Sequence, residues 1–288
     1  MNNTPSTVYR GRFAPSPTGP LHFGSLFAAV ISYLDAKKHG GQWLVRIDDI
    51  DTFREQPGST ESILSSLNKH GLIADETITF QSANKALYTE KLSQLKQHYY
   101  FCPCSRKSLL ENHGLHSQAC VQRSGDEQFC AVKFKSAPHQ QYCWHDLVRG
   151  NLSYQLIEDF VLKRKEGFYS YQLASVCDDL NQNITHVVRG VDLLESTPMQ
   201  LALFKALDTK APQFAHFPVI VNSNGQKLSK QNLAPAINDN TPIENLQAVL
   251  KLLNIQLNKA PSNPLQILKQ AVPQWNMANL TSSKHIQL

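Results

Sequence analysis

The chain has 288 residues, 41% of them hydrophobic and 18% charged, an ordinary balance for a globular protein large enough for more than one folding unit. Its formal charge of +5 favours a polyanionic partner without establishing one. The first residues, "MNNTPSTVYRGR", lack the apolar core of a secretion signal, and the longest apolar run, "LFAAVISYL", is too short to cross a bilayer. We therefore expect a cytoplasmic protein.

A strand, a helix and a second strand are predicted within the first fifty residues. The segments "TVYRGRF" at 7–13 and "QWLVRI" at 42–47 have the pattern of buried strands, and the second runs into the acidic stretch "DDID". Between them, a helix that begins near Phe23 carries its apolar residues on one stripe: Leu26, Phe27, Val30, Ile31 and Leu34. This order is a βαβ unit, which predicts a parallel sheet.

The remaining pattern predicts an α/β domain in two halves, 1–98 and 151–235, separated by an insert at 99–150. The insert is rich in cysteine and has short strands, of which "FCAVKF" is the clearest. Strand and helix patterns alternate again in the second half, and 236–288 has helical patterns followed by a polar tail. Further helices are expected at "ESILSSLNKHG", "ANKALYTEKLSQLKQH", "TPMQLALFKAL", "IENLQAVLKLLN" and "PLQILKQAV".

The segment before the first helix, "GRFAPSPTGPLHFGS" at 11–25, is suited to binding a nucleotide. Ligands of open α/β sheets bind beyond the carboxyl ends of the strands, where this helix presents its free N–H groups. Prolines stiffen the segment, Gly19 and Gly24 allow a ligand to approach the backbone, and His22 can donate to a phosphoryl oxygen. On its own, however, such a segment is more often a turn with a helix cap, and such a histidine is more often structural.

Two short motifs favour the nucleotide. "PLHFGS" resembles the HIGH motif of class I aminoacyl-tRNA synthetases, and "KLSKQ" at 227–231 resembles their KMSKS loop. The resemblance implies that ATP binds at His22, Gly24, Ser25, Lys227 and Lys230, with His22 and Lys230 in catalytic roles. Ser25 stands where many members have His or Thr. Without its partner motif, "KLSK" would be a solvated basic loop.

Longer stretches narrow the resemblance to the glutamate-specific branch of that family: "GRFAPSPTGPLHFGSL", "RIDDIDTFR", "YSYQLASVCDD" and "VVRGVDLL". By position, this implies an amino-acid pocket that includes Arg12, Ala14, Ser16, Tyr171 and Arg189.

The chemistry of glutamate requires such residues independently of the family. Its two carboxylates need guanidinium groups, which Arg12 and Arg189 can supply, and its ammonium needs an acid, which Asp48 can supply. The family usually has Glu at the position of Asp48. A deeper ligand, a bridging water or help from Asp49 could compensate for the missing methylene.

Three cysteines lie close together in the insert, and cytosolic thiols more often bind metal than pair. The family resemblance implies a structural Zn²⁺ site, in which a tyrosine four residues before the last cysteine is the fourth ligand. That position is His116 here, and His113 is a nearby substitute. The alternative is a set of unmetallated thiols. We interpret Cys130, Cys143 and Cys177 as small buried hydrophobes, and the predicted zinc ligands are Cys102, Cys104, His116 and Cys120.

Together, these features predict a Rossmann-like class I synthetase catalytic domain with a zinc-containing insert, a short helical C-terminal region and no anticodon-binding domain. The resemblance implies a ligase that converts L-glutamate and ATP, with Mg²⁺, into glutamyl-adenylate. Only about fifty residues follow "KLSKQ", too few for the large domain with which a full glutamyl-tRNA synthetase reads the anticodon. The family resemblance then implies a different acceptor, the queuosine cyclopentenediol at the wobble position of tRNA(Asp). The alternatives are a truncated glutamyl-tRNA synthetase, another adenylate-forming ligase and a non-catalytic tRNA-binding paralogue.

Overall fold

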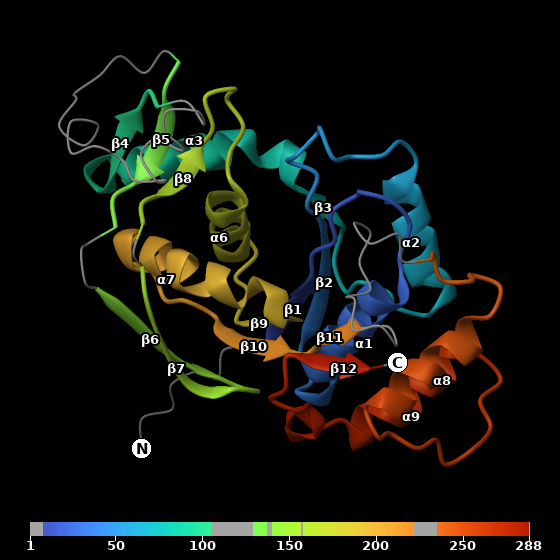
Figure 1. The fold of residues 1–288 in the computed structure, drawn as a ribbon. Coiled ribbons are helices and arrows are strands. Elements are labelled where there is room, and N and C mark those ends of the chain that lie inside the picture. Colours follow the sequence, from blue (N-terminus) through green and yellow to red (C-terminus); the bar gives the residue numbers. More distant parts are fainter. Residues whose placement is uncertain (1–7, 105–128, 137–139, 157, 222–234, 288) are drawn as a thin grey trace.

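The computed structural model describes residues 8–104, 129–136, 140–156, 158–221 and 235–287, and its centre is a seven-stranded mixed sheet (Figure 1). The strand order is β3-β2-β1-β9-β10-β6-β7, in which only the pair β6–β7 is antiparallel. The strands are β1 (Arg10–Phe13), β2 (Gln42–Ile47), β3 (Thr79–Phe80), β6 (Gln141–Asp146), β7 (Gly150–Gln155), β9 (His186–Gly190) and β10 (Gln213–Phe217).

The predicted βαβ unit is confirmed. Helix α1 (Phe23–Lys38) connects β1 to β2, and these strands pair in parallel from Arg10 opposite Gln42 to Phe13 opposite Val45. All five residues of the predicted apolar stripe of α1 are fully buried. Its C-terminal turn carries Lys37 and Lys38, as the helix dipole favours.

Helices cover both faces of the sheet and create two apolar cores. Helices α1, α8 (Pro242–Leu252) and α9 (Pro264–Ala271) share one core with alternate strand residues such as Trp43 and Val45. Helices α3 (Lys85–Gln94), α6 (Tyr171–Asn181) and α7 (Thr197–Ala206) share the other. Because both faces are covered, polar groups on these strands can reach a ligand only beyond the strand ends.

A second sheet, of three antiparallel strands, lies beside α3 (Figure 1). It has the order β4-β5-β8, with β4 (Tyr99–Cys102), β5 (Ala131–Phe134) and β8 (Phe160–Lys163). The strands of this sheet do not follow the expected insert boundaries of 99 and 150. Strand β6, inside those boundaries, joins the large sheet because its end pairs with β10, whereas β8, outside them, joins the small one.

The C-terminal part packs against helix α1. Trp275 donates a hydrogen bond through its ring nitrogen to Asp35 of α1 at 2.9 Å, with both residues buried. The expected polar tail ends in a strand, β12 (His285–Gln287), which pairs in parallel with β11 (Val219–Val221). No helix in the described parts of the chain is long and apolar enough to span a membrane. The remaining elements are α2 (Ser59–Lys69) and short 3₁₀ turns at Gln81–Asn84, Lys96–His98, Val191–Ser196, Val272–Gln274 and Met277–Asn279.

Candidate active site

Three buried arginines lie near the carboxyl ends of neighbouring parallel strands. Arg46 is on β2, Arg12 on β1 and Arg189 on β9, and none is more than 5% exposed. The carboxyl ends of parallel strands are where open α/β sheets bind ligands. Two of these arginines were expected there from the sequence, and Arg46 was not.

Helix α6 supplies carboxylates to two of the arginines. Asp179 accepts from Nε and Nη2 of Arg12 at 3.1 and 3.3 Å and from Nη1 of Arg46 at 2.7 Å. Asp178, its neighbour, has an oxygen 3.7 Å from Nε of Arg46. Sequence reasoning missed both acids and Arg46, although charged residues inside an apolar strand and on an apolar helix are a signal of a buried ion pair.

Asp48 directly follows β2 and completes this cluster. Nε of Arg46 donates to its Oδ1 at 2.8 Å, and its backbone N–H donates to the carbonyl of Pro15 at 2.9 Å. Burial raises the pKa of Asp48 to about 6, although the charge of Arg46 acts in the opposite direction. The cluster therefore holds three carboxyl groups against two guanidinium groups. Burial also raises the pKa of Asp178, so both Asp48 and Asp178 gain a proton more readily than an exposed aspartate.

The alternative of help from Asp49 is not supported by the geometry. Both oxygens of Asp49 bind Ser82, one accepting from its backbone N–H at 2.8 Å and the other from its hydroxyl at 2.6 Å. Gln81, unlike Asp49, lines the same pocket as Asp48. Its Nε2 donates to Asp178 at 2.8 Å, and its Oε1 is buried with no hydrogen-bond partner among the described residues.

Arg189 differs from the other two arginines because all its hydrogen-bond partners are neutral. Its Nε donates to Nε2 of His216 at 3.0 Å, its Nη2 to the hydroxyl of Thr197 at 2.9 Å and its Nη1 to the hydroxyl of Tyr171 at 3.4 Å. The guanidinium carbon lies 5.2 Å from the ring centre of Phe214. No carboxylate among the described residues forms an ion pair with this buried charge, and an unpaired buried charge is costly without an anionic ligand.

A pocket lies over this cluster. Of the predicted amino-acid-binding residues, Ser16, Asp48 and Tyr171 line it, whereas Arg12 and Arg189 are not among its lining residues and are bound to internal partners. Ala14, half-buried, follows β1 in the same loop as Ser16. Other lining residues are Ile50, Asp51, Arg54, Gln81, Arg164, Phe168 and Tyr169.

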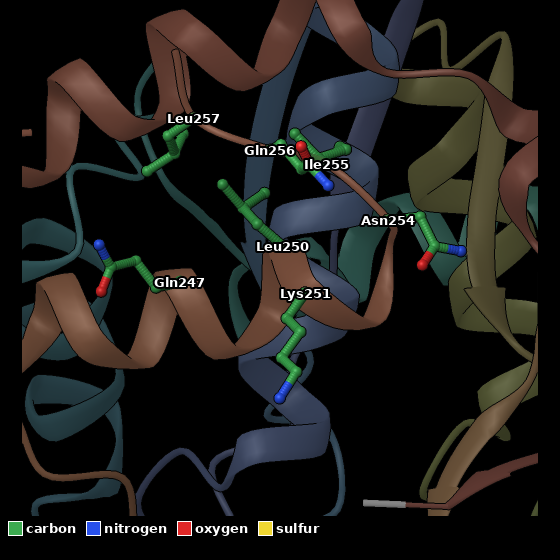
Figure 2. Close-up of a pocket in the computed structure, with 7 residues that line it drawn as sticks. All are labelled: Gln247, Leu250, Lys251, Asn254, Ile255, Gln256 and Leu257. Atoms are coloured by element: carbon green, nitrogen blue, oxygen red, sulfur yellow. The ribbon is translucent and has the colours of Figure 1, made fainter. Parts of the chain in front are cut away.

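A hollow elsewhere in the molecule has different chemistry. It lies between α8 and the segment that follows α8, and Figure 2 shows Lys251 pointing away beside apolar and amide side chains. Its other lining residues are Gln247, Leu250, Asn254, Ile255, Gln256 and Leu257. It offers no cluster of opposite charges, so the pocket at the strand ends is the better candidate for an amino acid.

The predicted nucleotide-binding residues are described only in part. His22 is the N-cap of α1, where its Nδ1 accepts from the backbone N–H of Ser25 at 3.2 Å and its Nε2 lies 3.0 Å from the Ser25 hydroxyl. Gly24, in the same first turn, is half-buried. Lys227 and Lys230 lie outside the described residues. Just after them in sequence, Ala236 forms an antiparallel bridge with His22.

Two of the predicted zinc ligands are described. Cys102 ends β4 and is buried, and Cys104 packs against it and Tyr100. His113, His116 and Cys120 lie outside the described residues. Of the other cysteines, Cys177 is buried as predicted and Cys130 is half-buried, but the prediction is wrong for Cys143, because alternation along the two-stranded ribbon β6–β7 turns this side chain outward.

Comparison of this sequence with known proteins finds class I tRNA synthetases. Residues 8–255 match the family of the tRNA synthetases class I (E and Q), catalytic domain. Proteins named glutamyl-Q tRNA(Asp) synthetase are similar over most of the chain. That of Idiomarina loihiensis is 43% identical over 278 residues, which are 93% of this chain and 97% of the relative, and that of Shewanella oneidensis is 41% identical over 290 residues, 99% of this chain and 96% of the relative.

A solved structure is also similar, that of a glutamate tRNA ligase from Elizabethkingia meningosepticum in complex with its amino acid. The TM-score is 0.78 at 25% sequence identity. The match covers 96% of this chain and 66% of that ligase, so this chain spans about two thirds of its length.

The charge cluster makes a prediction about stability. Arg46→Leu removes the guanidinium shared by Asp48 and Asp179, which leaves Asp48 without its cation and Asp179 with Arg12 alone, so we expect the free energy of unfolding to fall by about 3 to 5 kcal/mol. Urea unfolding followed by circular dichroism measures it. The control is Glu76→Gln, at a partly exposed ion pair with Arg10, which should cost less than about 1 kcal/mol. Equal losses in both variants would contradict the cluster's role.

Proposed function

This chain belongs to the glutamyl-Q tRNA(Asp) synthetases, ligases with the catalytic domain of the class I tRNA synthetases for glutamate and glutamine, and from this we propose that it activates L-glutamate with ATP and transfers it to queuosine in tRNA(Asp). The first step joins the α-carboxylate of glutamate to the α-phosphorus of ATP and releases pyrophosphate. The second step transfers the glutamyl group to a hydroxyl of the queuosine cyclopentenediol at the wobble position. Both steps take place in the cytoplasm, with the tRNA.

The observation that carries the substrate is the buried guanidinium of Arg189, whose partners in the described part of the chain are all neutral. A carboxylate of the ligand would supply the missing negative charge. The ammonium group of glutamate fits the opposite imbalance, since three carboxyl groups share two guanidinium groups around Asp48. A zwitterion with a second carboxylate therefore suits this site better than an uncharged ligand.

Asp48 and Gln81 together offer two acceptors for that ammonium. Gln81 lines the same pocket as Asp48, and its buried side-chain carbonyl oxygen has no hydrogen-bond partner among the described residues. We assign it the second hydrogen bond to the ammonium. This second hydrogen bond would compensate for the shorter side chain of Asp48, which has one methylene fewer than the Glu that the family usually has at this position.

The phosphate groups of ATP are assigned to the N-terminus of α1. Its free N–H groups and dipole favour an anion, and His22 there is tied to Ser25 by two contacts. Gly24 leaves room for close approach. Lys227 and Lys230 are proposed to hold the triphosphate, with Lys230 stabilising the charge on departing pyrophosphate. Mg²⁺ supplies the remaining neutralisation when bound with ATP. The bridge between Ala236 and His22 supports this assignment, because it brings the end of the lysine-bearing segment to the phosphate site.

A structural zinc ion is proposed in the small sheet, at a site that the glutamate and phosphate groups do not use. The described donors fit zinc, because two thiol groups two residues apart pack together at the end of β4. Cys102, Cys104, His116 and Cys120 would hold the ion, with His113 as the substitute for His116.

The proposed function is tested by following glutamate from ATP to RNA. We expect glutamate-dependent exchange of pyrophosphate into ATP without tRNA, and transfer of labelled glutamate to tRNA(Asp) with queuosine but not to the same tRNA with guanosine at that position. Mass mapping of nuclease fragments should place the label in the anticodon loop. Lys230→Ala, the inactive control, should lose about a hundredfold or more in exchange.

Other outcomes of that experiment identify the alternatives. Label on the 3′-terminal adenosine would indicate a truncated glutamyl-tRNA synthetase. Exchange without transfer to any tRNA would indicate another adenylate-forming ligase, and absence of exchange a non-catalytic RNA-binding protein.

The raised pKa of Asp48 predicts the pH dependence of glutamate binding. Because only the ionised carboxylate attracts an ammonium, kcat/KM for glutamate should fall as the pH falls through about 6 and reach its plateau above that value. Exchange rates at several pH values measure it. Asp48→Asn should lower the plateau value of kcat/KM by about ten- to a hundredfold and remove the decrease of kcat/KM on the acid side of the pH profile. An unchanged acid limb in the variant would assign the titration to another group.

Removal of a zinc ligand should act on stability before activity. Cys104→Ser should release metal during purification and lower the midpoint of thermal unfolding. Metal content by atomic emission and calorimetry measure both effects. Cys143→Ser, on the exposed face of β6, is the matched control and should change neither. Wild-type protein that purifies without zinc and does not gain thermal stability when zinc is added would contradict the site.

A further inference from the structure

Arg189 is held by a chain of buried residues that crosses three neighbouring strands. Asp146 is the last residue of β6, His216 lies on β10, and Arg189 lies directly opposite His216 on β9. Oδ2 of Asp146 is 2.5 Å from Nδ1 of His216, and Nε2 of His216 is 3.0 Å from Nε of Arg189. His216 and Asp146 are both completely buried. Sequence reasoning identified neither of them.

The donors and acceptors in this chain fix the protonation of the imidazole. The Nε of Arg189 always carries a hydrogen, so Nε2 of His216 must accept. The hydroxyl of Thr197 lies 3.1 Å from the same nitrogen and accepts from Nη2 of Arg189, so it lies beside this hydrogen bond and ties the guanidinium to the same place. The ring proton therefore lies on Nδ1 and is donated to Asp146.

Asp146 is built to remain ionised and fixed. Its Oδ1 accepts from the backbone N–H groups of Val148, Arg149 and His216 at 3.1, 3.1 and 3.2 Å. Burial raises the pKa of Asp146, but its hydrogen bonds from His216 outweigh burial and the pKa is lowered. Burial lowers the pKa of His216, and the charge of Arg189 acts in the same direction, which keeps the ring neutral.

We propose that His216, oriented by Asp146, is a positioning residue that aims Arg189 at a carboxylate of the substrate while leaving its positive charge uncancelled. This inference rests on the proposed glutamate substrate. A carboxylate in place of the imidazole would also orient Arg189, but it would form the ion pair that the ligand must form. The neutral ring instead accepts a hydrogen bond from the Nε–H of Arg189. It also keeps the negative charge of Asp146 one side chain away from the guanidinium.

Kinetics of three variants test this role. His216→Leu should raise KM for glutamate by about ten- to a hundredfold, the range that one hydrogen bond to a charged group supplies, with KM for ATP unchanged and kcat at saturating glutamate within about threefold. His216→Gln, which can still offer an acceptor to Arg189, should recover part of this loss. His70→Leu is the matched control, since His70 is equally buried but contacts Ser66 and Asn245. It should lower thermal stability without changing KM for glutamate.

Nitrogen NMR of protein with ¹⁵N-labelled histidine reports the geometry directly. The His216 signals, assigned by their loss in His216→Gln, should show a protonated Nδ1 and an unprotonated Nε2 at neutral pH. The opposite tautomer, or an unchanged KM for glutamate in His216→Leu with normal wild-type exchange, would overturn this proposal alone. Absence of glutamate-dependent exchange in the wild type would overturn the substrate assignment, and this inference with it.

Discussion

The charge of three buried arginines at the ends of adjacent strands determines how this site is built. A guanidinium group buried without a partner is costly, so each arginine must be compensated inside the fold or by a ligand. Asp179 compensates Arg12 and shares Arg46 with Asp48. Arg189 donates only to neutral acceptors among the described residues, so we propose that a substrate supplies its compensation. The fold thus places one positive charge without a carboxylate partner among the described residues at the ends of these strands.

Helix α6 connects these compensated and uncompensated charges as one rigid element. Its first residue, Tyr171, contacts Arg189, and Asp178 and Asp179, about 10 to 12 Å farther along the helix axis, contact Arg46 and Arg12. Ser170 caps its N-terminus by accepting from the N–H of Leu173. Because one helix contacts all three arginines, a shift of α6 would disturb all three together.

The sequence predicted most of this fold, because its strongest signals are local. The stripe of α1 and the strands around it follow from apolar periodicity, and the motifs identified Arg12, Asp48, Tyr171 and Arg189 as site candidates. Pairing between distant residues has no local signal. The joining of β8 to the small sheet, the contact of Asp179 with two strands and the chain from Asp146 to Arg189 all depend on tertiary packing.

The order of charges along the strand ends gives the pocket a direction. From β9 through β1 to β2 and the turn after β3, the charged and polar groups at the strand ends change from the Arg189 guanidinium, behind the pocket wall, through Arg12 neutralised by Asp179, to Asp48 and Gln81, which line the pocket. An amino acid has its own positive and negative ends, so only one orientation matches this gradient. In the proposed complex, the carboxylate bound by Arg189 would lie toward β9 and the ammonium toward β2. Because the gradient is fixed by parallel strand register and not by mobile surface side chains, the proposed substrate would be oriented as it binds, before any phosphate chemistry begins.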